Sequence, residues 1–330
     1  MTLVGYGFVG QAAHEILKRY GEVKIIDPAK GYPECYADNE IYYIAINPKL
    51  DFSGLYDVLD KIKERLNSIA IIESTLSMEA LRTIEWKYRF PIIYVPERVQ
   101  PGGKKASVRL YATLHCDDPE DADEAIRPIR DNYDLIEVGP EQAVITKLTE
   151  NAYRYFQIAF SNLISESFGE EVVGLVNTHQ NVKLMQPGIG IGGLCLEKDT
   201  AFFLDSLPRS EILYELYKFG KKIPSVVAGN IEEEIFTSSI GYQVKTISVF
   251  GKAYKPNTNI TTNSKALEIV EKLRRNYEVL HYDPFVDDSC PKGFFHSEWL
   301  VVLVGHDQWR QYAKMFKKVI DARSGWARRV

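Results

Sequence analysis

One of the four cysteines, Cys195, lies in a segment that could make it a nucleophile. Gly192 and Gly193 come just before it and leave the backbone open to a bulky ligand. Lys198 and Asp199 follow it, and a nearby ammonium group favours the thiolate, which is the reactive form of a cysteine. A cysteine is more often a small buried apolar residue, so the chemical interpretation depends on the residues that accompany this one.

Two further polar residues, Lys147 and Asn151, are four positions apart in a segment with helical periodicity. Residues at this spacing share one face of a helix. Alone, such a pair is typical of a solvated face. The pair therefore gains a chemical meaning only from the family resemblance described below.

A glycine-rich turn, Gly5-Tyr6-Gly7-Phe8-Val9-Gly10, lies between an apolar strand and an amphipathic helix. In such a turn the first glycine allows a tight bend, the second lets the backbone approach a pyrophosphate, and the third lets the helix pack on the strand. Asp27 ends the next strand, where a carboxylate can accept both ribose hydroxyls and would repel a 2′-phosphate. These residues predict a site for NAD rather than NADP. The alternative is a tight turn that binds nothing.

Strands and helices alternate in the first part of the chain, which indicates a parallel, doubly wound sheet. The expected strands are residues 2–4, 23–27, 42–46, 69–72 and 92–95. Residues 142 to 238 have mainly helical periodicity. The alternation then restarts with expected strands at 246–251, 278–284 and 300–304.

The sequence therefore predicts an α/β protein with two Rossmann-like doubly wound domains, residues 1–141 and 239–330, joined by a central helical domain, residues 142–238. Glu22–Pro28 resembles Glu278–Pro284, which we interpret as a weak internal repeat. A long apolar helix near residues 212 to 235 favours a homodimer. The alternative for that helix is packing within the chain.

Composition excludes several classes of function. The formal net charge is -5 and no block of basic residues is present, which argues against nucleic-acid binding. No apolar run approaches the ~18 residues of a membrane-spanning helix. The cysteines are far apart and form no CxxC pair, so we expect no metal site, no disulfide framework and a cytoplasmic location. The glycine-rich turn follows Met1 so closely that we expect no signal peptide.

The chain resembles the UDP-glucose/GDP-mannose dehydrogenase family along almost its whole length. Seven segments have the order and spacing of that family. They are residues 4–10, 73–75, 96–102, 147–151, 190–195, 250–255 and 281–284. The resemblance implies the oxidation of C6 of a nucleotide sugar from alcohol to acid, with two NAD⁺ used in turn.

The resemblance also implies roles for individual residues. Cys195 would capture the aldehyde as a thiohemiacetal and carry a thioester that water hydrolyses. Lys147 would stabilise the developing oxyanion, and Asn151 would orient the substrate hydroxyl. Asp199 and Thr75 would hold the water used in base catalysis and hydrolysis. Glu97 is the candidate general base for thioester hydrolysis.

Two sets of binding residues follow from the resemblance. Those expected to bind NAD are Gly5, Gly7, Phe8, Val9, Gly10, Asp27 and Thr75. Those expected to bind the UDP-sugar are Glu97, Arg98, Lys147, Asn151, Gly192, Gly193, Tyr254 and Lys255.

Features of the sequence disagree about the sugar. Residues 96–102, and the segment 177–188 with His179, resemble the branch that oxidises UDP-N-acetylhexosamines. Lys198 before Asp199 resembles the UDP-glucose and GDP-mannose branches. We favour a UDP-N-acetylhexosamine such as UDP-N-acetylmannosamine, with UDP-glucose as the alternative. His179 could instead be a polar residue at a helix end.

One departure from the family concerns the cofactor. Thr262 stands where the family has an arginine that reaches towards the cofactor. A charge-assisted hydrogen bond contributes ~1.5–3 kcal/mol, so the affinity for NAD would fall unless another base substitutes. Two alternative functions follow: a catalytically weakened sugar-nucleotide-binding relative, and a simple hydroxyacid dehydrogenase, which would have no need of the Cys195 segment.

Overall fold

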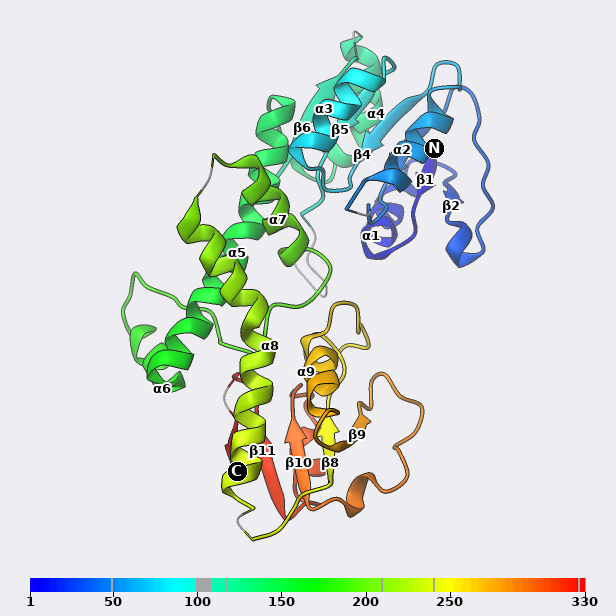
Figure 1. Ribbon diagram of the computed structural model, residues 1–330. Coiled ribbons are helices and arrows are strands. Elements are labelled where there is room, and N and C mark those ends of the chain that lie inside the picture. The colour runs from blue at the N-terminus through cyan, green and yellow to red at the C-terminus, as the bar shows by residue number, and fades with distance from the viewer. Residues whose placement is uncertain are drawn as a thin grey trace. The chain divides into compact units, whose positions relative to one another are not determined.

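The computed structural model describes residues 1–48, 50–98, 108–116, 118–208, 210–239, 241–325 and 327–329. The chain forms two compact units, Met1–Glu150 and Asn151–Val330 (Figure 1). The boundary falls inside the long helix α5, Pro140–Phe168. The three-domain division made from the sequence remains a prediction.

Unit 1 is built around a seven-stranded sheet in the order β2-β1-β3-β4-β5-β6-β7. Its strands are β1 Thr2–Val4, β2 Lys24–Ile26, β3 Ile41–Ile44, β4 Ile69–Ile72, β5 Ile92–Tyr94, β6 Val108–Leu114 and β7 Asp134–Glu137. Its helices are α1 Phe8–Leu17, η1 Pro28–Lys30, α2 Ser53–Ile62, α3 Met78–Lys87, α4 Pro119–Arg130 and the first part of α5. Neighbouring strands are parallel except β5 and β6.

The apolar residues of these strands and helices make the core of unit 1. Leu3, Tyr43, Ile71 and Ile93 on adjacent strands are fully buried, and α1 and α4 pack against them. Such burial contributes ~1.5–3 kcal/mol for each large side chain. The interior strands are apolar on both faces, as expected for a parallel sheet covered by helices.

Unit 2 combines helices with a second sheet in the order β12-β11-β10-β8-β9. Its helices are the rest of α5, α6 Glu170–Val176, α7 Leu196–Ser206, α8 Glu211–Thr237, α9 Lys265–Leu273, η2 Phe294–His296 and α10 Trp309–Ala313. Its strands are β8 Thr246–Phe250, β9 Glu278–Tyr282, β10 Trp299–Val302, β11 Lys318–Asp321 and β12 Arg328–Arg329. Only β12 is antiparallel to its neighbour.

The second half of α8 lies alongside this sheet next to α9 (Figure 1). Val227 and Ile231 of α8 are buried against Val249 of β8 and Ile269 of α9. The C-terminal half of α8 is therefore packed within the chain. The predicted fold class, with two mainly parallel sheets and a helical region between them in sequence, is confirmed.

The internal repeat seen in the sequence is also a repeat of structure. The order β2-β1-β3-β4 in unit 1 matches β9-β8-β10-β11 in unit 2. In each copy the first strand is followed by a glycine with positive φ, 91° at Gly5 and 101° at Gly251. The N–H of Gly5 donates to Ile26 O at 2.8 Å, and that of Gly251 to Tyr282 O at 2.9 Å. The same turn therefore closes both copies.

Within the described ranges, no helix combines the length and the apolar character needed to cross a bilayer.

Candidate active site

Cys195 is the residue on which α7 begins, and its side chain is exposed. Its carbonyl oxygen accepts the N–H of Asp199 at 2.8 Å, which closes the first turn of the helix. The partial positive charge at a helix N-terminus favours an anion there. The sulfur is thus accessible and lies where a thiolate is stabilised.

Asp199 connects the cysteine helix to α5. Its Oδ2 accepts a hydrogen bond from Asn151 Nδ2 at 2.6 Å, and its Oδ1 is 2.6 Å from Lys198 Nζ. The Asp199 side chain is 1% exposed and that of Lys198 is 17% exposed. The structure therefore brings together two predicted site residues, Asn151 and Asp199, that are far apart in sequence. Lys198 directs its charge to Asp199.

The glycines before Cys195 are required by close packing. Gly193 has φ +90°, and a Cβ there would lie 3.2 Å from the ring of Tyr254. A Cβ on Gly192 would lie 2.8 Å from the carbonyl oxygen of Asn263. Tyr254, predicted to bind substrate, therefore lies directly against the glycine pair. Lys255 extends over the Tyr254 ring, with Nζ 5.6 Å from its centroid.

A buried carboxylate, Asp283, holds the loop that carries Tyr254 and Lys255. Its Oδ2 accepts the N–H groups of Lys252 at 2.6 Å and Ala253 at 3.0 Å, and a bond from His306 Nε2 at 2.9 Å. Its Oδ1 accepts the N–H of Phe285 at 2.9 Å. Although burial opposes the charge, the bonds from His306 and the backbone lower the pKa of Asp283 to about 2.

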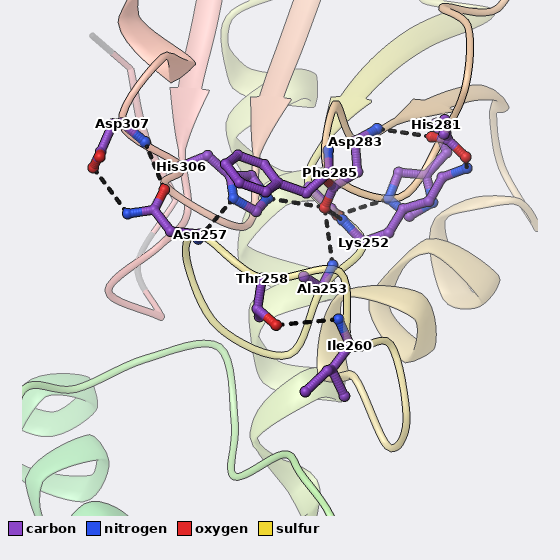
Figure 2. A network of polar contacts seen from close by, with 12 residues as sticks. Lys252, Ala253, Asn257, Thr258, Ile260, His281, Asp283, Phe285, His306 and Asp307 are labelled. Carbon is purple, nitrogen blue, oxygen red and sulfur yellow. Dashed lines mark hydrogen bonds and ion pairs between the residues drawn. The ribbon is translucent and has the colours of Figure 1, made fainter. Parts of the chain in front are cut away.

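His306 completes this network, with Asp283 at its centre (Figure 2). Its Nδ1 accepts the N–H of Asn257 at 2.9 Å, so the proton between His306 and Asp283 belongs to Nε2. The ring of Phe285 stacks on that of His306, with centroids 4.5 Å apart. The first part of the loop 252–264, from Lys252 to Asn257, is therefore held by this network.

The glycine-rich turn of unit 1 has the geometry that a dinucleotide site needs. A Cβ on Gly5 would lie 2.6 Å from Ala45 O, and a Cβ on Gly10 would overlap Gly5 O, whereas Gly7 faces open space. Asp27 Oδ2 accepts the N–H of Tyr6 at 2.8 Å. Gly5 lies between β1 and β3, where the strand order reverses and open α/β sheets bind ligands. Phe8 and Val9, the other predicted contacts, begin α1.

Thr75 and Glu97 follow the carboxyl ends of β4 and β5, at the same edge of the sheet as Gly5. Thr75 is half-buried. Glu97 is 7% exposed, and its Oε1 accepts the N–H of Arg98 at 2.7 Å. Arg98 also pairs with Glu150 on α5. Within unit 1 these predicted residues therefore line one edge of the sheet, and Glu97 is nearly enclosed.

Glu97 belongs to a buried group of three charges that the sequence did not predict. Arg109 on β6 lies 2.9 Å from Glu97 Oε2 and 2.9 Å from Glu73 Oε2, and it donates to Val95 O at 2.6 Å. Burial raises the pKa of Glu73 to about 7, and Glu97 adds to this effect against the attraction of Arg109. Burial opposes the charge on Arg109, but both carboxylates raise its pKa. The guanidinium therefore stays charged, and Glu73 holds a proton only below about pH 7.

Two predicted residues remain. Lys147 is half-buried on α5, one helical turn before Asn151. His179 lies just after α6, and its Nδ1 accepts the N–H of Asn181 at 3.2 Å. The His179 ring thus stabilises the local turn, which is the alternative interpretation given above. Among the described residues, no cluster of His, Cys, Asp or Glu could hold a metal ion.

Sequence reasoning missed Arg109 and a second set of residues around Glu197. A lone arginine in an otherwise apolar strand was the available signal for Arg109. Glu197 is two residues after Cys195, and its partner Lys265 comes 68 residues later. Nothing in the local sequence pairs them.

The two sheets, the glycine turn with its acidic partner and the exposed cysteine are features expected of a dehydrogenase. The family model for the central domain of the UDP-glucose/GDP-mannose dehydrogenase family matches residues 141–223. The model for the UDP binding domain of the same family matches residues 248–326.

Proteins that are similar to most of this chain point to the same family. The UDP-N-acetyl-D-mannosamine dehydrogenase of Pyrococcus horikoshii is 27% identical, with 92% of this chain and 81% of the relative covered. The protein of the same name from Methanocaldococcus jannaschii is 27% identical, with 81% and 66% covered. The solved UDP-D-ManNAc dehydrogenase of Pyrococcus horikoshii is 26% identical with a TM-score of 0.76, covering 97% of this chain and 85% of the other. The chain belongs to the UDP-glucose/GDP-mannose dehydrogenase family, and it is an oxidoreductase of nucleotide sugars, as the motifs predicted.

Proposed function

We propose that this protein oxidises C6 of a UDP-N-acetylhexosamine from alcohol to carboxylate, with Cys195 as a covalent nucleophile. One observation carries the proposal. Cys195 is exposed at the N-terminus of α7, while Asp199 one turn further on is tied to Asn151 of α5. A reactive sulfur and a hydrogen-bonded polar pair on neighbouring helices suit chemistry at a carbonyl carbon.

The proposed reaction balances in atoms and charge. The C6 alcohol loses a hydride and a proton and becomes an aldehyde. The thiolate of Cys195 adds to the aldehyde carbon, and the oxygen takes a proton to give a thiohemiacetal. Loss of a second hydride and proton leaves a thioester, which water cleaves to a carboxylate, the thiol and a proton. Covalent capture keeps the aldehyde in the site between the oxidations.

Side chains of this chain would assist these steps. Asn151 is oriented by Asp199, so its remaining amide atoms can bind the substrate hydroxyl. Lys147, one turn earlier on α5, would stabilise the negative oxygen of each tetrahedral state. Thr75 and Glu97 keep the roles in water binding and hydrolysis that the resemblance implies. Tyr254 and Lys255 would bind the nucleotide sugar, and their loop is held by Asp283.

NAD is the proposed cofactor, and it would accept each hydride. The residues of the glycine turn fit it, because Gly7 leaves open space beside the start of α1 while Gly5 and Gly10 pack tightly. The N-terminus of α1 would face the pyrophosphate. Among the described residues Asp27 makes one side-chain hydrogen bond, through Oδ2, so Oδ1 can accept a ribose hydroxyl.

The names of the relatives support the hexosamine over glucose. Both curated relatives described above are UDP-N-acetyl-D-mannosamine dehydrogenases. UDP-N-acetylmannosamine is therefore the proposed substrate, and UDP-glucose is the alternative. His179 Nδ1 accepts the N–H of Asn181 in the turn after α6, and the proposed choice of substrate rests on the names of the relatives.

The deciding experiment measures NADH production with UDP-N-acetylmannosamine, UDP-N-acetylglucosamine, UDP-glucose and GDP-mannose. We expect turnover with the first, and no turnover with any of the four would refute the function. Cys195→Ser should abolish net acid formation while nucleotide-sugar binding persists. Cys35→Ser is the matched control, because Cys35 is also exposed and plays no part in the proposal. Full acid production by the Cys195 variant would eliminate the covalent route.

We also propose that the protein is a homodimer. Apolar side chains are exposed on the first half of α8 and on α5: Ile212 is 83% exposed and Tyr153 is 62% exposed. Large exposed apolar residues of this kind often mark interaction surfaces. Light scattering tests the mass, and Ile212→Glu should yield monomers. A wild-type monomer would refute this assembly. The cytoplasmic location expected from the cysteines is likewise a proposal, and cell fractionation tests it.

A further inference from the structure

The carboxylate of Glu197 ties the cysteine turn to two other elements of unit 2. Glu197 is the second residue of α7, two positions after Cys195. Its Oε2 accepts Lys265 Nζ at 3.0 Å and Asn263 Nδ2 at 3.2 Å. Its Oε1 lies 3.4 Å from Lys221 Nζ on α8. One side chain therefore connects α7 with α8 and with the start of α9.

Asn263 ties the same turn at a second point. Its Nδ2 also donates to Gly193 O at 3.0 Å, and its Oδ1 accepts Lys265 Nζ at 3.1 Å. Asn263 has φ 51°, in the left-handed region that asparagine tolerates better than most residues. The carbonyl of Gly193 and the carboxylate of Glu197 flank Cys195, so both sides of the nucleophile are fixed by one asparagine.

The packing of the glycines restricts the turn further. A Cβ on Gly192 would lie 2.8 Å from Asn263 O, and one on Gly190 would lie 2.9 Å from Lys265 Cγ. The turn therefore lies directly on the 263–265 segment. Lys265 is 9% exposed, so its ammonium depends on these acceptors. Burial opposes the charge on Glu197, but Lys265 and Asn263 lower the pKa of Glu197 below its ordinary value.

We propose that Glu197, Asn263 and Lys265 form a clamp that holds the Cys195 turn in its reactive position. The three are positioning residues, because they act on the reaction through the location of the sulfur. This inference rests on the proposed role of Cys195. It also assigns a role to the segment in which Thr262 replaces the arginine of the family, because Asn263 and Lys265, which follow Thr262, contact the Cys195 turn.

The first test measures hydrogen exchange in residues 188–197 of the full chain without ligands. In Lys265→Met and Glu197→Ala, we expect amide exchange there to rise by about tenfold or more, while β8 and the second half of α8 stay protected. Lys265→Arg should retain most of the protection. Glu268→Gln is the matched control, because Glu268 is the other acidic neighbour of Lys265, at 3.6 Å, and does not belong to the clamp. Unchanged exchange in both clamp variants would overturn the proposal.

The second test separates positioning from a general structural role. With UDP-N-acetylmannosamine and NAD⁺, Asn263→Ala should lower kcat by about tenfold or more and leave both KM values within about twofold, since small displacements of a reacting group cost this much. The double variant Glu197→Ala/Lys265→Met should be no slower than the worse single variant. If amide exchange at residues 188–197 rises but kcat is unchanged, the three residues do not position the sulfur for the reaction. Full activity of Cys195→Ser would instead refute the proposed function and leave the exchange result standing.

Asn263→Ala also serves if a lysine or glutamate variant does not fold, because it removes no charge. Its exchange pattern alone then decides whether the clamp exists. An Asn263→Ala protein with wild-type exchange at residues 188–197 and wild-type kcat would end the proposal.

Discussion

The charge group around Arg109 makes the stability of unit 1 depend on pH. Glu73 is 3% exposed and shares Arg109 with Glu97. Burial raises the pKa of Glu73 from an ordinary value of 4.5 to about 7. When the pKa of a carboxyl group is higher in the folded than in the unfolded protein, its contribution to stability is fully present at pH values below the unfolded-state pKa. That contribution is lost as the pH rises through the folded pKa.

Glu73→Gln isolates this effect, because glutamine resembles the protonated carboxyl group. The rise of the Glu73 pKa from 4.5 to about 7, at 1.36 kcal/mol for each pKa unit, corresponds to about 3 kcal/mol in the free energy of unfolding. We expect wild type and variant to have similar stability near pH 4.5. The variant should be more stable by about 3 kcal/mol at pH 8, where the wild type must bury the charge.

Scanning calorimetry over this pH range provides the measurement. For a unit of this size, 3 kcal/mol corresponds to a Tm difference of roughly 6–12 °C in the transition of unit 1. Glu64→Gln is the control, because Glu64 is exposed in the same unit and should show no such trend. A stability difference that does not change with pH, or a variant that is less stable at pH 8, would refute the reasoning.

Three other predictions concern the two nucleotide-binding-like turns. Gly10→Ala should lower the Tm by the equivalent of ~1–3 kcal/mol, because its Cβ would overlap Gly5 O, whereas Gly7→Ala should fold normally. Asp283→Asn should lower the free energy of unfolding in urea by about 2 kcal/mol at pH 7. This loss of stability should shrink as the pH falls from 3.8 towards 2, because the hydrogen bonds that lower the pKa of Asp283 stabilise only its ionised form. Asp27→Asn should reduce kcat/KM for NAD⁺ by about tenfold and narrow its advantage over NADP⁺; an unchanged cofactor ratio in steady-state assays would contradict the role of Asp27.

The sequence predicted the fold well because strands and helices alternate with clear periodicity. The same signal could not predict strand direction. β6 pairs antiparallel to β5, and its alternation of buried and partly exposed residues is compatible with either direction. The two turns were predictable because glycine is required there by close contacts, as at Gly5 against Ala45 O.

Candidate site residues could be proposed from the sequence where the chemistry needs particular residue types, as at Cys195 and Asp199. Contacts between distant segments were not predictable, because no local pattern specifies a partner. Glu197 illustrates this limit: its charge was visible beside the cysteine, but its meaning comes from Asn263 and Lys265. Arg109 is similar, since its importance depends on two carboxylates from neighbouring strands.

The two copies of the repeat have the same turn but different uses for it. Where unit 1 has Gly7 and Gly10, the second copy has Ala253 and Pro256, and its helix begins only at Lys265. The acidic residue has changed as well. Among described residues the carboxylate of Asp27 accepts one N–H, whereas the carboxylate of Asp283 accepts four hydrogen bonds and retains little capacity for a ribose. A backbone loop, residues 252–264, occupies the stretch in which unit 1 starts its helix.

The loop of residues 252–264 connects the second copy of the repeat to the proposed active site at Cys195. One end is fixed by Asp283 and His306, and the other carries Asn263 to the Cys195 turn. If either end of the loop were mobile, ordering it to position the Cys195 sulfur would cost conformational entropy. Because the Asp283 carboxylate accepts four hydrogen bonds from the protein, it cannot serve as a second acceptor for ribose hydroxyls. The same bonds hold the start of the loop rigidly. The absence of a dinucleotide turn at this place in unit 2 and the proposed positioning of Cys195 therefore depend on the same loop, residues 252–264.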